Sequence, residues 1–229
     1  MNIAFVPARC GSKAIRFKNI KSFCGKPLIY WSLLSLENAT SVDIVYVATD
    51  CSEIVEVVEG FNFSKVNIYI RDKENAQDES STEAVMLEFL NKNSFKDDDL
   101  FMLTQATSPT TTSDDFDKAI KKLKELGKDS LLSVVREKRF FWGDDEKPIN
   151  YDYKNRPRRQ DFKGILLENG AFYISTVSNI LKDKNRLSGD ICFYEMQDYN
   201  MIDIDEQIDW AIAEEYMREY ILLKCQLTN

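Results

Sequence analysis

Short apolar runs alternate with longer amphipathic segments along the first two-thirds of the chain. The runs are rich in β-branched and aromatic residues, which is typical of buried parallel strands, and they cover residues 3–6, 43–50, 66–70, 100–104 and 130–135. Apolar residues at helical spacing lie between or after these runs, at residues 27–38, 53–59, 80–91 and 114–126. This alternation predicts an α/β fold: a mostly parallel, mixed sheet with helices on both faces.

The pattern changes at about residue 136. Residues 136–163 are polar, aromatic and basic, and their glycine and prolines leave no room for a helix. Strand patterns and a long closing amphipathic helix follow, at residues 169–175, 191–196 and 206–223. We therefore expect a single domain, residues 1–229, with a small excursion from the main sheet at about 136–190.

The acidic composition narrows the class of function. A net charge of −8 argues against a general nucleic-acid surface, which needs a basic face. The sequence has no apolar run long enough for a membrane span and no secretory signal, so we expect no membrane partner.

The sequence has no histidine, which excludes Ser-His-Asp triads, Cys-His pairs and His-ligated metals. Any metal ion would be held by oxygen, which favours Mg²⁺ or Mn²⁺.

The cysteines give an expectation about the compartment. There are five of them, no two have CxxC spacing, and they occur at positions 10, 24, 51, 192 and 225. An odd number without such spacing argues against a disulfide framework and against a zinc knuckle. The sequence therefore predicts a protein of the reducing cytoplasm.

The first apolar run leads directly into a basic, glycine-containing loop. Its polar residues are Arg9, Gly11, Ser12, Lys13, Lys18 and Asn19. A strand, a cationic loop and a helix in this order are what nucleotide-binding α/β proteins use to bind phosphate. The GxxxxGK[ST] and GxGxxG fingerprints are both absent, so a solvated basic loop is the alternative interpretation.

Two charged clusters lie in the last third of the chain. Asp203 and Asp205 flank one isoleucine, and in an extended segment their carboxylates lie on the same face, where they can share one Mg²⁺. The alternative is that Asp205 only caps the closing helix. Residues 154–163 hold five cations against one acid, which favours a small anionic ligand over a nucleic-acid patch or localisation signal.

Four segments resemble signatures of the CMP-sialic acid synthetases, the acylneuraminate cytidylyltransferases. Residues 6–20 resemble I/L-P-A-R-G-G-S-K-x-I-P-x-K-N, with Cys10 in place of a glycine and Arg16 in place of the proline. Residues 105–109 resemble the start of Q-P-T-S-P-L-R, and residues 156–173 resemble R-P-R-R-Q-D-W/F-x-G-x-L-x-E-N-G-x-F-Y. Residues 203–214 resemble D-I-D-x-x-x-D-W/L-x-x-A-E. The resemblance follows the family's order over residues 3 to about 216.

This resemblance implies a Rossmann-like nucleotidyltransferase fold that joins CTP and a nine-carbon 2-keto sugar acid of the N-acetylneuraminate type. The products would be CMP-sialic acid and pyrophosphate. It also implies a homodimer in which the excursion completes the partner's sugar pocket. Mg²⁺ (or Mn²⁺) would be held by Asp203 and Asp205, which with Arg9 and Lys13 form the expected catalytic residues.

The resemblance also assigns binding residues. The nucleotide would be bound by Arg9, Gly11, Ser12, Lys13, Asn19, Arg71, Ser81 and Gln105, with Ser80 an equal candidate beside Ser81. The sugar acid would be bound by Gln105, Arg158, Arg159 and Asn169, and the sequence does not decide between the two adjacent arginines.

Two alternative functions stay open from the sequence. One is transfer of CMP to a related acid, such as deaminated neuraminic, legionaminic or octulosonic acid. The other is a non-catalytic nucleotide-sensing or assembly protein, because a fold alone does not give a function. Since the chain stops soon after the closing helix, we also expect no C-terminal hydrolase-like domain of the kind some relatives carry.

Overall fold

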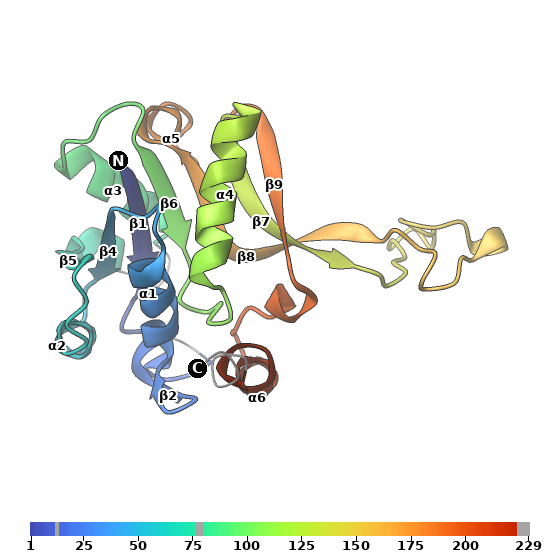
Figure 1. Cartoon of the computed structure of the whole chain (residues 1–229), viewed down its shortest axis with the longest axis horizontal. Coiled ribbons are helices and arrows are strands. Elements are labelled where there is room, and N and C mark those ends of the chain that lie inside the picture. The colour runs from blue at the N-terminus through green and yellow to red at the C-terminus, as the bar shows by residue number, and fades with distance from the viewer. Residues whose placement is uncertain (12–13, 77–79, 224–229) are drawn as a thin grey trace.

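A central seven-stranded sheet organises the chain in the computed structural model, which describes residues 1–11, 14–76 and 80–223 (Figure 1). Its strands are β1 (Asn2–Pro7), β4 (Ile44–Thr49), β5 (Val66–Ile70), β6 (Leu100–Thr104), β7 (Ser130–Glu137), β8 (Ile165–Thr176) and β9 (Ile191–Met196). They lie in the order β5-β4-β1-β6-β8-β7-β9. Strands β5, β4, β1 and β6 are parallel, and β8 runs antiparallel to both β6 and β7. The predicted mixed, mostly parallel sheet is confirmed.

Helices cover both faces of this sheet. One face carries α1 (Leu28–Asn38), α2 (Ser52–Glu59) and α4 (Ser113–Leu126), and the other carries α3 (Thr82–Lys92) and α5 (Val177–Asp183). The sequence of strand β1 is continuously apolar because both of its faces are buried. Ala4 and Val6 pack on the first face, and Ile3 and Phe5 pack on the second. The sheet is therefore a buried middle layer, as predicted.

A third, smaller core lies below the carboxyl ends of the central strands. Helix α6 (Gln207–Tyr216), continued by a π-helical segment (Met217–Leu222), packs there on a short hairpin of β2 (Ser22–Phe23) and β3 (Lys26–Pro27). The rings of Trp210 and Phe23 meet edge to face, with centroids 5.4 Å apart. The closing helix, predicted as one helix over 206–223, changes from α-helical to π-helical geometry after Tyr216.

Short 3-10 helices occur elsewhere in the chain, at Lys18–Ile20, Lys73–Ala76, Tyr153–Asn155 and Asp198–Met201.

A thin projection, here called the arm (residues 136–168), extends away from the sheet (Figure 1). The ends of β7 and β8 form its base, since β9 pairs with β7 only as far as Val135. The ring of Phe140 lies 4.4 Å from that of Tyr151 and 4.8 Å from that of Phe162, measured between centroids. The arm therefore has a small aromatic cluster of its own.

Two expectations about local structure need correction. The excursion is narrower than the predicted 136–190, because β8 rejoins β6 at Phe172 and the following helix α5 packs on the main body. Helix α5 was not predicted; it has only seven residues and follows its strand without a break. The cap of α3 is Ser81, which accepts a hydrogen bond from the Ala84 amide.

The cysteines also differ from expectation. Cys10 and Cys51 form a disulfide, with Cα atoms 5.1 Å apart. The pair could not be predicted from the spacing of the cysteines, because the two residues are far apart in the sequence and β1 and β4 become neighbours only in the folded sheet. Within the described part of the chain, no helix has the length and apolar character needed to cross a membrane.

Candidate active site

The carboxyl ends of the parallel strands meet at one edge of the sheet and border a cavity of about 460 Å³. The segments that line it follow β1, β5 and β6 and include the first turn of α3 and the loop before α6. The lining residues are Pro7, Arg9, Lys18, Asn19, Arg71, Ser80, Ser81, Thr82, Val85, Gln105, Ala106, Thr107, Asp203 and Asp205.

The loop after β1 forms one wall of the cavity. The side-chain amide of Asn19 donates to the backbone oxygen of Arg9 at 3.3 Å, which ties the two ends of the loop together. Lys18 reaches across to the end of the chain, where its Nζ donates to the Ile204 oxygen at 2.5 Å and lies 3.1 Å from Asp205 Oδ1. The basic loop and the acidic segment are thus parts of one site.

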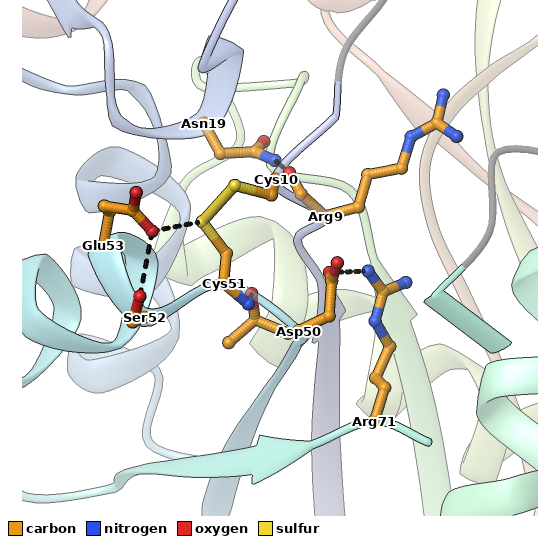
Figure 2. The surroundings of a disulfide bond; sticks show 9 residues. Arg9, Cys10, Asn19, Asp50, Cys51, Ser52, Glu53 and Arg71 are labelled. Atoms are coloured by element: carbon orange, nitrogen blue, oxygen red, sulfur yellow. Dashed lines mark hydrogen bonds and ion pairs between the residues drawn. A yellow bond between two sulfur atoms is a disulfide. The ribbon is translucent and has the colours of Figure 1, made fainter. Parts of the chain in front are cut away.

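Arg71 forms the opposite wall and is only 8% exposed. Its guanidinium donates to Asp50 at the end of β4, and its backbone amide donates to the Thr49 oxygen at 3.0 Å (Figure 2). Arg71 Nε is buried and has no hydrogen-bond partner among the described residues. Buried polar atoms are nearly always paired in folded proteins, so this donor fits a ligand that brings an acceptor into the cavity.

The start of α3 adds backbone donors to the same cavity. Ser81 and Thr82 line it, and the Ser81 hydroxyl already accepts from the Ala84 amide at 3.1 Å. The other amides of a helix's first turn have no partner within the helix and carry a partial positive charge. This end of α3 therefore favours a negatively charged or hydrogen-bond-accepting ligand.

Asp203 and Asp205 supply the acidic side of the cavity. Removal of water by the cavity wall raises the pKa of Asp203 above its usual value, the Thr107 side chain opposes this with a hydrogen bond, and the Asp205 charge adds to it. The alternative that Asp205 only caps the last helix is wrong. Glu206 is the cap of α6, in a reciprocal capping box with Asp209.

This pair of carboxylates fits a divalent cation. The charge of Asp205 disfavours the ionised form of Asp203, and a cation bound by both carboxylates would relieve that repulsion. Mg²⁺ is commonly bound by one or two carboxylates together with water and phosphate oxygens, so two protein ligands are sufficient.

Five of the expected nucleotide-binding residues line the cavity: Arg9, Asn19, Arg71, Ser81 and Gln105. Gly11 is described but does not line it. Ser12 and Lys13 lie outside the described residues. Of the loop after β1, the residues that line the cavity are therefore those at its two ends, Arg9 at the start and Lys18 and Asn19 at the end.

Asn169, expected to face the sugar, is buried and does not line the cavity. It is 4% exposed, and its Nδ2 donates to the Asn200 oxygen at 2.9 Å. Its burial was not predictable from the sequence, because Asn169 lies at a register shift of β8, a strand that pairs with two different neighbours.

Arg158 and Arg159 lie in the arm rather than beside the main cavity. Arg159 lines a second cavity, of about 470 Å³, together with Lys138, Arg139, Phe140, Arg156 and Pro157. Arg158 Nε is 2.7 Å from Asp161 Oδ2. The two adjacent arginines therefore have different surroundings, which the sequence did not separate.

Two residues of the cavity received no individual role from the sequence, although Lys18 was named as part of the basic loop. Lys18 fixes Asp205, and Thr107 hydrogen-bonds Asp203 through its side chain and accepts from the Ile204 amide at 3.1 Å. Both lie inside segments that the sequence singled out, so position within those segments was the available signal.

Comparison with known proteins gives a consistent result. Residues 3–228 match the model of a family described as cytidylyltransferase. The chain is 36% identical to an N-acylneuraminate cytidylyltransferase of Oncorhynchus mykiss, over 93% of this chain and 49% of that protein. It is 30% identical to a pseudaminic acid cytidylyltransferase of Campylobacter jejuni, over 76% of this chain and 78% of that protein. The chain thus spans about half the length of the first of these relatives.

A solved structure of similar fold is CMP:2-keto-3-deoxy-manno-octonic acid synthetase complexed with CTP. It superposes with a TM-score of 0.72 at 16% sequence identity, and the match covers 96% of this chain and 99% of that one. At this identity the likeness shows the fold.

Proposed function

Because the chain belongs to the cytidylyltransferase family, we propose that it joins CTP to a nine-carbon 2-keto sugar acid of the N-acetylneuraminate type. The anomeric hydroxyl of the sugar attacks the α-phosphorus, the bond to the β-phosphate oxygen breaks, and CMP-sugar and pyrophosphate result. The observation that carries this proposal is the main cavity, in which Arg9 and Arg71 lie with Asp203 and Asp205.

Catalysis of such a transfer consists mainly of positioning and charge stabilisation. Arg9 is assigned to the phosphates, where its charge is most useful as negative charge grows on the leaving group. Arg71 and the start of α3 are assigned to the cytidine, with Arg71 Nε as the available donor. Lys18 holds Asp205 in place and keeps the acidic segment against the first loop.

Mg²⁺ held by Asp203 and Asp205 would neutralise phosphate charge and lower the pKa of the attacking hydroxyl. That chemistry matters in this chain because the sequence has no histidine to act as a general base. The raised pKa of Asp203, caused mainly by its partial burial, is what a carboxylate awaiting a positive partner is expected to show.

We further propose a homodimer of the cytoplasm in which the arm serves the partner's sugar site. The arm exposes large apolar side chains that a monomer would leave in water, including Trp142, Ile149 and Leu167. The basic cavity of the arm suits the carboxylate of a sugar acid.

Pyrophosphate release tests the reaction. The chain would be incubated with CTP, Mg²⁺ and each of a panel of acids: N-acetylneuraminic, deaminated neuraminic, legionaminic, pseudaminic and octulosonic. We expect the highest kcat/KM with N-acetylneuraminic acid, complete loss of release with a chelator, and recovery on adding Mg²⁺.

The same panel separates the alternatives. A higher kcat/KM with another acid would replace the substrate but keep the reaction class. Tight CTP binding without release from any acid would favour the non-catalytic binding protein instead.

A further inference from the structure

The disulfide between Cys10 and Cys51 lies at the edge of the main cavity. The last paired residues of strands β1 and β4 are Pro7 and Ala48. Cys10 comes three residues after Pro7, and Cys51 comes three residues after Ala48. Parallel neighbours of matched register bring the two following segments side by side, so a covalent link needs no long reach. The bond therefore joins the loop after β1 to the turn before α2 (Figure 2).

Each cysteine is directly connected to one wall of the cavity. Arg9 precedes Cys10, lines the cavity and accepts from Asn19 through its backbone oxygen. Asp50 precedes Cys51 and pairs with the buried Arg71. Figure 2 shows the disulfide beside these residues, with Arg9 next to Cys10 and Asp50 next to Cys51. Breaking the bond would release the Arg9 loop from the segment that orients Arg71.

The surroundings of the two sulfurs differ in a way that sets the order of exchange. Cys51 is 3% exposed, whereas Cys10 is partly exposed. An external thiolate therefore reaches Cys10 Sγ, forms a mixed disulfide there and expels Cys51 as a thiolate. Cys51 then takes a proton from water, and its thiol can donate to Glu53 Oε2, which lies 3.2 Å from Cys51 Sγ.

A second external thiol completes the reaction by attacking the external sulfur of the mixed disulfide and releasing the Cys10 thiol. The protein disulfide and two small thiols thus give two protein thiols and one small-molecule disulfide, with electrons and protons balanced. Oxidation is the same sequence in reverse, with the small-molecule disulfide as oxidant. Glutathione in its reduced and oxidised forms is the chemical class of partner.

We propose that Cys10 and Cys51 form a reversible thiol–disulfide site that exchanges with low-molecular-weight thiols and sets the affinity of the main cavity for CTP. The second half rests on the proposed function. The oxidised form holds Arg9 in the position that lines the cavity. Because a preorganised loop has less ordering to do on binding, the oxidised form binds CTP about two- to tenfold more tightly.

Thermodynamic linkage makes this coupling reciprocal. If the disulfide raises CTP affinity by some factor, CTP raises the equilibrium constant for disulfide formation by the same factor. A disulfide that only stabilised the fold, without acting on the cavity, would show neither effect. The two measurements therefore have to agree.

The test uses the full chain in glutathione buffers of graded ratio, with and without saturating CTP. Alkylation of thiols followed by mass spectrometry gives the fraction of Cys10 linked to Cys51, and titration calorimetry gives the CTP Kd of fully reduced and fully oxidised protein. We expect the midpoint of oxidation to shift with CTP by the same two- to tenfold factor as the Kd. Equal Kd values, an unmoved midpoint or absence of the Cys10–Cys51 link overturns the proposal.

Variants separate this site from other thiol effects. Cys10→Ser and Cys51→Ser are each expected to bind CTP like the reduced protein under all conditions. Cys24→Ser is the control and keeps the full redox response, because Cys24 is not part of the disulfide. A redox response in Cys51→Ser overturns the proposal.

These measurements distinguish failure of the redox site from failure of the proposed enzyme activity. Redox-dependent CTP binding without pyrophosphate release from any acid would overturn the enzyme and support this site. Normal turnover with redox-independent CTP binding would do the opposite. Absence of CTP binding in both redox states would overturn both.

Discussion

Arg158 and Arg159 are neighbours in the arm, but their charges are in different surroundings. Arg158 pairs with Asp161 three residues away, while Arg159 faces the basic arm cavity. A guanidinium already bound to a carboxylate is a poorer site for a second one, because the existing pair must first be broken. Of the two candidates that the sequence left open, the structure favours Arg159 for the sugar acid.

We therefore predict that Arg159→Ala lowers kcat/KM for the sugar acid about ten- to a hundredfold, the loss of one charge-assisted hydrogen bond. Arg158→Ala is the matched control and should lower it by less. CTP affinity should be unchanged in both, since neither residue lines the main cavity. Steady-state kinetics with each substrate varied in turn would check this, and a larger defect in Arg158→Ala would reverse the assignment.

The site residues that could be predicted from the sequence are those that follow a parallel strand. Arg9, Arg71 and Gln105 come just after predicted parallel strands, whose ends must share one edge of a sheet, so their convergence was foreseeable. The Cys10–Cys51 pair depends on which strands are neighbours, and a single sequence does not contain the strand order.

At the scale of elements, the base of the arm depends on one glycine. Gly164 has φ of +74°, and a Cβ there would lie 2.3 Å from the backbone oxygen of Glu137. A backbone oxygen that belongs to the paired strand β7 cannot move aside without separating the two strands. Any side chain at this position therefore displaces the arm.

Gly164→Ala should reduce kcat/KM for the sugar acid while leaving CTP affinity unchanged, because only the arm is displaced. Gly127→Ala is a matched control: φ is +58° there, but a Cβ would meet nothing within 4 Å. It should cost about 1 kcal/mol of unfolding free energy and leave sugar kinetics unchanged. Urea denaturation and kinetics of both variants would check this, and equal sugar kinetics in the two would contradict it.

Elements with a strong apolar period were predicted almost to the residue. Strands β5, β6 and β9 have the predicted bounds, because each is a short run of apolar and β-branched residues set off by polar neighbours. Helix α5 was missed because its seven residues offer too little periodicity. Its remaining signal is the Thr176 cap, which accepts from the Asn179 amide. The narrower arm follows from long-range pairing of β8, which no local pattern encodes.

For the whole molecule, the arm gives the proposed dimer a test. Leu167 is 40% exposed on the arm strand β8, beside the equally apolar Ile165 and Leu166. Wild-type chain should sediment as a dimer at micromolar concentration, and Leu167→Glu should shift it toward monomer by placing a charge where apolar surface is buried. The variant should keep CTP affinity but lose sugar turnover. A monomeric wild type with full turnover would refute the dimer.

The arm extends away from the central sheet (Figure 1), and all residues that line the main cavity lie outside the arm, which has a consequence for mixed populations of subunits. If each working site combines the cavity of one subunit with the arm of the other, a chain inactivated by Asp203→Asn still offers a sound arm. A chain impaired by Arg159→Ala still offers a sound cavity. Co-expressed, the two should exchange parts, so that half of the randomly paired dimers regain one of two sites and activity recovers to about a quarter of the wild type. Two alleles, each defective alone, would then complement each other.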